Sequence, residues 1–239
     1  MRVLALDTTA RTASSVALVV DGRVIVERAG AEHRSQAERF PADVTAVLSG
    51  AGLSLADIDL FAVASGPGSF TGIRIGIATA QGLALARRRP VAPVSALRAL
   101  AERAASGLPA GARVGAWMDA HRRDVFTALY DVTTPASDTT PAVLAEVEGP
   151  SASAPADTAQ RWTDLGMPAA IAGDGAALYR HLIPEAVLVV PHGQLAGALG
   201  RIAGQLHAAG QSMPPAGVQP LYVRRPDVEV ARDAARQAQ

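Results

Sequence analysis

Cysteine and lysine are both missing from the 239 residues of this chain. Without cysteine, the protein cannot form disulfides, use a thiol nucleophile, or hold a cysteine-ligated zinc ion or iron–sulfur cluster. All 22 residues of the Lys+Arg count are arginine, which excludes a Walker-type phosphate lysine and a lysine Schiff base. Composition alone therefore removes many common kinds of enzyme chemistry.

Aromatic residues and net charge are scarce as well. Aromatic residues make up 4% of the chain, too few for an evident base-stacking platform. The 22 basic residues balance 22 acidic ones, so we expect nucleic acid to be met only through a local patch or a partner. No apolar run approaches the roughly 18 residues of a membrane span, and Asp7 comes too early for a secretory signal. We expect a cytoplasmic protein that does not contact membranes.

The hydrophobic and turn patterns predict an α/β protein. Hydrophobic residues make up 49% of the chain, enough for a buried core. Apolar runs at residues 3–6, 14–20 and 23–27, with Asp21-Gly22 between the last two, predict a three-stranded antiparallel meander. Helices and strands then alternate, which indicates a mixed sheet with helices on its faces. The expected elements here are a helix from Phe40 to Ala51 that is either kinked at Pro41 or regular only after it, a strand at 60–64, a helix at 73–88, a strand at 91–94 and a helix begun by Ser95.

A second unit begins near Arg113. The patterns predict three domain ranges: an N-terminal lobe at 1–105, a reduced C-terminal lobe at 106–223 and a flexible tail at 224–239. Pro, Ala, Ser and Thr dominate residues 133–157, which indicates an exposed excursion or long loop rather than core. The expected elements of the second lobe are strands at 114–118, 124–130, 170–172 and 187–190, a polar turn at 119–123 and a helix at 194–209.

A glycine-rich loop precedes the helix at 73–88. Such a loop presents backbone N–H groups at the positive end of the helix dipole, where an anion could bind. The alternative, that the glycines serve only the turn geometry, is the more common one for such loops. The candidate anion-binding residues are Gly66, Gly68, Ser69 and Thr71.

The helix after this loop carries small residues every four positions, at Gly72, Gly76, Ala80 and Ala84. Small residues at this spacing form a ridge along which another backbone can approach closely. The ridge could pack on the protein's own sheet or on another subunit, and the residues leave both open. Either arrangement makes Gly76 intolerant of a larger side chain. The candidate interface residues are Phe40, Val44, Val47, Gly72, Arg74, Gly76, Ala80 and Ala84.

Metal and hydrolase motifs are weak. Asp7, Asp119 and Asp174 are candidate oxygen ligands for a magnesium ion, but capping of turns is the more common role for such residues. The five histidines contain no HxxH or HxxxH pair, and no Gly-x-Ser-x-Gly elbow occurs. We therefore predict no metal site and no catalytic residues.

Several motifs occur in the order found in one protein family. Besides the runs around Asp7, Asp119 and Asp174, they are His33-Arg34-Ser35, residues 66–76 (GPGSFTGIRIG) and residues 220–224 (PLYVR). Together they resemble the TsaB (YeaZ) family, bacterial proteins that take part in making threonylcarbamoyladenosine on tRNA. The resemblance covers nearly the whole chain, and the Gly-Pro-Gly-Ser-Phe-Thr-Gly stretch is its most specific part.

The resemblance implies an actin-like, Hsp70-like, sugar-kinase-like (ribonuclease-H-like) fold with two related lobes. It also implies a non-catalytic subunit that binds the catalytic protein TsaD together with the ATPase TsaE, forms a homodimer when alone, and meets tRNA only through the complex. No cofactor is expected, except a nucleotide or magnesium ion at an interface within the complex. The alternative is an enzyme acting by itself, as a nucleotide-dependent transferase or a peptidase.

Overall fold

The computed structural model describes residues 1–10, 14–30 and 36–224, with side chains described from Phe40 onward in the last range. The His33-Arg34-Ser35 motif lies outside the described residues. So does the predicted flexible tail at 224–239, apart from Arg224.

The first sheet contains five strands in the order β3-β2-β1-β4-β5. Strands β1, β2 and β3 pair antiparallel, which confirms the predicted meander, whereas β4 and β5 add on parallel to β1. The turn between β2 and β3 has positive φ at Asp21 (47°) and Gly22 (79°), as an Asp-Gly hairpin requires. The bounds are β1 (Arg2–Asp7), β2 (Ser15–Val20), β3 (Arg23–Ala29), β4 (Leu60–Gly66) and β5 (Val91–Ser95).

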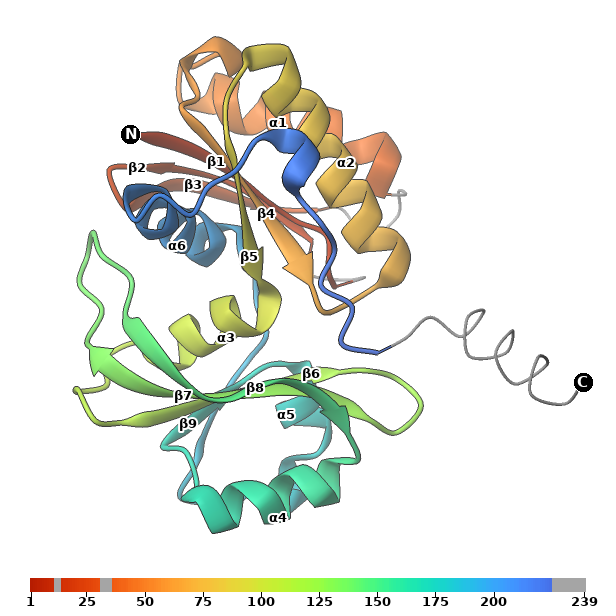
Figure 1. Ribbon diagram of the computed structural model, residues 1–239, viewed down its shortest axis with the longest axis vertical. Helices are drawn as coiled ribbons and strands as arrows, with labels where there is room; N and C mark the ends of the chain where they lie inside the picture. The colour runs from red at the N-terminus through yellow and green to blue at the C-terminus, as the bar shows by residue number, and fades with distance from the viewer. Residues whose placement is uncertain (11–13, 31–35, 225–239) are drawn as a thin grey trace, which may run out of the picture.

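Helices cover both faces of this sheet. Helices α1 and α2 lie on one face and α6 lies on the other (Figure 1). Helix α1 runs through Pro41 instead of beginning after it, and Thr45 donates its hydroxyl hydrogen to the Pro41 carbonyl at 2.9 Å. The bounds are α1 (Gln36–Gly50), η1 (Leu55–Asp57), α2 (Phe70–Arg87) and α6 (Ala196–Ala208).

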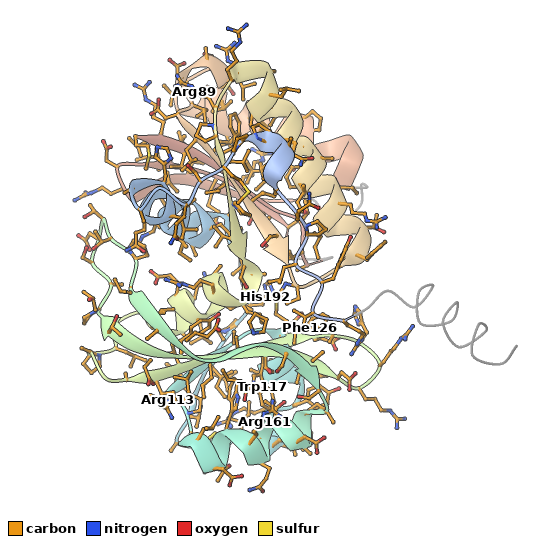
Figure 2. The ribbon with its side chains drawn as sticks, viewed as in Figure 1. Arg89, Arg113, Trp117, Phe126, Arg161 and His192 are labelled. Atoms are coloured by element: carbon orange, nitrogen blue, oxygen red, sulfur yellow. The ribbon has the colours of Figure 1, made fainter. Side chains whose placement is uncertain are left out.

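The second sheet also has five strands, in the order β10-β9-β6-β7-β8. Helices α4 and α5 pack on one face, where Figure 2 shows Trp117 and Arg161. The Trp117 and Trp162 rings lie 5.6 Å apart there, and a Cβ on Gly115 would collide with Trp162. The bounds are β6 (Arg113–Asp119), β7 (Val125–Thr134), β8 (Val143–Ser153), α4 (Pro155–Leu165), β9 (Ala170–Ala172), α5 (Asp174–Leu178), η2 (Arg180–Leu182), β10 (Leu188–Val190) and η3 (Pro215–Gly217).

The prediction of a loop at 133–157 was wrong. This stretch holds the end of β7, the whole of β8 and the start of α4. Strand β8 pairs antiparallel with β7, and the register shifts three times along the pair. Strand β8 lies at the edge of the sheet and its side chains are partly exposed, so few of its residues have to be hydrophobic. Its composition therefore resembles that of a loop.

Two helices cross between the halves. Helix α3 (Ala96–Ala104) follows β5 in the chain but packs mainly on the second sheet, whereas α6 comes from the second half and packs on the first sheet. The two helices also contact each other, so one hydrophobic cluster runs continuously through both sheets. The described part of the chain contains no helix that is long and apolar enough to span a membrane.

The small-residue ridge of α2 faces the protein's own sheet. Gly72, Gly76, Ala80 and Ala84 are all buried, and a Cβ on Gly76 would collide with the hydroxyl oxygen of Thr8. The structure thus shows the first of the two arrangements that the sequence left open. The ridge lets α2 approach β4 and the end of β1 closely.

We predict that Gly76→Leu lowers the free energy of unfolding by about 2 kcal/mol or more, because its side chain has to displace Thr8. The control is Gly82→Ala in the same helix, where no atom lies within 4 Å of the added Cβ. This control is expected to stabilise the protein by roughly 0.5–1 kcal/mol, because alanine favours helix over glycine. Urea unfolding of both variants measures the difference, and equal stability would contradict the assignment of the ridge to the core.

Candidate protein-interaction surface

A shallow apolar groove of about 360 Å³ lies on the outer face of the first sheet, between α1 and α2. The two helices contact each other at only a few positions, which leaves the space between them open. Small side chains such as Thr45, Ser49 and Thr79 border the groove. The lining residues are Pro41, Val44, Thr45, Leu48, Ser49, Leu53, Ser54, Leu55, Thr79 and Leu83. The groove has the apolar, accessible character of a surface that another protein can cover.

Most residues predicted for the interface are core residues. Phe40, Val44 and Val47 are buried in the cluster that packs α1 against the sheet, and only Val44 also borders the groove. The glycine and alanine ridge of α2 is buried as well, as described above. These buried side chains are not available to contact a partner. They support the surface from beneath. Of the predicted set, Arg74 alone is exposed.

The opposite face of α2 is also apolar, and it is open. Ala78 and Gly82 are exposed on this helix, Ile75 is half-buried, and the Leu85 side chain is 72% exposed. A surface helix of a globular protein normally has a polar outer face, and one that is apolar all round is usually covered on both sides. These positions recur at 3.6-residue spacing from Thr71 to Leu85, so the sequence contains this second stripe beside the glycine ridge.

An aromatic and arginine cluster stands at the N-terminal end of α2. The Phe70 and Tyr222 rings stack with their centroids 5.2 Å apart, and the Arg74 guanidinium lies 3.9 Å over the Phe70 ring. Arg74 also donates a hydrogen bond from Nε to the Tyr222 hydroxyl at 2.9 Å. Both rings remain partly exposed, Phe70 at 40% and Tyr222 at 37%. Sequence reasoning missed this cluster because Tyr222 lies 148 positions from Arg74 in the chain.

The C-terminal segment holds this cluster in place by crossing α2. Met213 exchanges two backbone hydrogen bonds with Val91, each of 2.9 Å, and so extends the β5 edge. Farther along, Gln81 of α2 donates to the Pro215 carbonyl at 2.9 Å, and the Leu221 amide donates to Ser65 at 2.7 Å. At the end of its described part, Arg224 pairs with Asp124 of the second half. It therefore ties the outer face of α2 to the β6–β7 turn.

The glycine-rich loop is built around contacts with the turn after β1. Gly66 (φ 120°) and Gly68 (φ 151°) have positive φ, and a Cβ on Gly68 would lie 2.6 Å from the Thr9 carbonyl oxygen. The Ser69 amide donates to that same oxygen at 2.8 Å, and the Ser69 hydroxyl accepts from Gly72 as the N-cap of α2. Thr71 is exposed beside it. These contacts give the loop a structural role, and binding of an anion there stays a prediction.

The three candidate aspartates do not come together as one group. Asp174 accepts hydrogen bonds from the amides of Asp119 and Gly175, both at 2.9 Å, and Asp119 accepts from His121. Asp7 is fully buried at the end of β1, where burial raises its pKa although hydrogen bonds from Thr9 act in the opposite direction. Among the described residues, no three His, Cys, Asp or Glu side chains are grouped as a metal ion requires. Turn capping thus accounts for Asp119 and Asp174.

Comparisons with known proteins identify the family of this chain. The family model "TsaD: tRNA N6-adenosine threonylcarbamoyltransferase" matches residues 12–195. The Escherichia coli K12 protein named "tRNA threonylcarbamoyladenosine biosynthesis protein TsaB" is 35% identical over 233 residues, which cover 94% of this chain and 95% of that relative. The chain belongs to the TsaB family. The resemblance drawn from its motifs is confirmed.

Solved structures of TsaB-family relatives confirm the expected fold. YeaZ from Pseudomonas aeruginosa has a TM-score of 0.74 and 32% identity, with 92% of this chain and 99% of that chain covered. A second Pseudomonas aeruginosa structure, described as similar to peptidase YEAZ, has a TM-score of 0.76 and 33% identity, with 93% and 99% covered. Two mixed sheets flanked by helices are thus the actin-like, sugar-kinase-like architecture that the TsaB resemblance implied.

We predict that Tyr222→Ala lowers the free energy of unfolding by about 1–2 kcal/mol, because the variant loses both the Phe70 stack and the Arg74 hydrogen bond. Tyr222→Phe keeps the stack, so it is expected to lose less than half as much. Thermal unfolding of both variants measures this order. If Tyr222→Ala leaves the midpoint unchanged, the C-terminal segment does not hold the cluster.

Proposed function

We propose that this TsaB-family protein is a non-catalytic subunit in the synthesis of threonylcarbamoyladenosine on tRNA. It acts by docking the outer face of α1 and α2 onto the catalytic subunit TsaD, and the ATPase TsaE joins the same assembly. The observation that carries the proposal is the apolar outer face of α2, open beside the groove in a protein of this family. The docking site that we propose is therefore the outer face of α1 and α2 and not the buried glycine and alanine ridge of α2.

The same face accounts for association of the protein with itself. An exposed helix with Ala78 and Gly82 in its middle lets another helix approach closely, and Leu85 offers an apolar anchor beside them. A two-fold symmetric pair would place the two α2 helices against each other. The homodimer and the TsaD complex then compete for one surface, and tRNA is met only through the complex. No cofactor is assigned to the chain alone; a nucleotide or magnesium ion belongs, in this proposal, to an interface within the complex.

A single charge placed on this face tests the proposal. Gly82→Glu puts a carboxylate where no atom lies within 4 Å of the new Cβ, so the fold is expected to survive while docking is lost. We expect a monomer by light scattering, at least a tenfold weaker affinity for TsaD by calorimetry, and a matching loss of tRNA modification when TsaD and TsaE are supplied.

Two matched variants control this experiment. Gly82→Ala keeps the face small and uncharged and is expected to associate like the wild type. Ala177→Glu places the same charge at an exposed position of α5 in the second half and is expected to have no effect. If Gly82→Glu associates like the wild type, the docking site does not lie on this face. Modification or ATP turnover by the chain alone would instead support an independent nucleotide-dependent transferase or peptidase.

A further inference from the structure

The hairpin between β7 and β8 reaches from the second sheet to the first half of the protein (Figure 1). Its tip, residues 135–142, lies against the β2–β3 turn so closely that a Cβ on Gly22 would collide with the carbonyl oxygen of Thr139. The tip is therefore a bridge between the two halves, and it lies away from the α1–α2 face.

Helix α6 donates hydrogen bonds to three backbone carbonyl groups of the tip. Arg201 donates from Nη2 to the carbonyl oxygens of Ser137 (2.6 Å) and Thr140 (2.7 Å). One turn farther along, Gln205 donates to the Pro141 carbonyl at 3.1 Å. Because α6 packs on the first sheet, these bonds attach the second-half hairpin to the first half.

Helix α3 supplies an acceptor, and this acceptor is a buried acid. Glu102 is 4% exposed, and its Oε2 accepts the Ala142 amide hydrogen at 2.7 Å. Its Oε1 lies 3.9 Å from Arg201 Nη1, and Arg98 on its own helix is the other charged group that acts on it. Because Ala142 of the tip contacts this carboxyl directly, we expect that lifting the tip exposes Glu102 to water, so closing the tip and protonating Glu102 are linked.

We propose that the β7–β8 tip is a pH-responsive latch that holds the two halves together, with Glu102 as the group that sets its strength. In the closed latch, burial raises the pKa of Glu102 from 4.5 to about 7, although Ala142 and Arg201 act to lower it. An acid with a raised pKa stabilises the closed form fully below pH 4.5, and this contribution is lost as the pH rises through about 7. The latch loosens on the alkaline side.

Hydrogen exchange of the Ala142 amide in the full-length protein tests the latch. After correction for the intrinsic exchange rate, we expect its protection factor to fall roughly tenfold between pH 6 and pH 8, because opening becomes that much more favourable. Glu102→Gln cannot ionise and is expected to show the same protection at both pH values. Glu185→Gln, at an exposed acid before β10, serves as the control and is expected to keep the wild-type fall.

Two results would overturn the latch. One is a Glu102→Gln variant whose Ala142 protection falls with pH as in the wild type. The other needs no variant: the carboxyl carbon of Glu102, followed by NMR in the wild-type protein, is expected to titrate near pH 7, and a midpoint near 4.5 would contradict the proposal.

Discussion

The close approach of α2 to the first sheet is the constraint on which the rest of the molecule depends. Gly76 lies against Thr8, and the loop that begins the helix is fitted to the Thr9 carbonyl through Gly68 and Ser69. The buried ridge uses one side of α2, and the C-terminal segment covers part of the other side through Gln81. The apolar stripe that includes Leu85 stays accessible. The same helix therefore stabilises the lobe and presents its open surface.

The exchange of α3 and α6 gives the two halves a common interior. Because each helix packs mainly on the sheet of the other half, the hydrophobic cluster around them is continuous. Figure 2 shows His192 in the layer between the sheets, just before α6. The hairpin tip closes one side of this layer through Arg201 and Glu102. A buried acid at that position makes the joint depend on a proton.

The α1–α2 face and the joint between the halves are suited to different kinds of contact. The outer face of the first sheet is apolar, shallow and bordered by small side chains, which suits contact between helices. The joint between the halves is instead polar at its rim and depends on exact hydrogen bonds. A subunit that acts by docking needs a preformed face, and the core residues Phe40 and Val47 form its underside. Their burial explains why an interface predicted from apolar spacing fell on the supporting layer.

Local patterns in the sequence determined the local structure and the family. Asp21-Gly22 predicted the β2–β3 hairpin because its two residues accept positive φ, and the glycine-rich motif at 66–72 indicated the TsaB family. Tertiary structure alone decided which way each apolar stripe faces. Both stripes of α2 have helical spacing, and packing against β4 and Thr8 makes the one at Gly76 internal. Likewise burial in the folded protein raises the pKa of Glu102, and Tyr222 stacks on Phe70, which lies far away in the chain. Sequence spacing records which residues share a face, but burial depends on what the folded chain brings against that face.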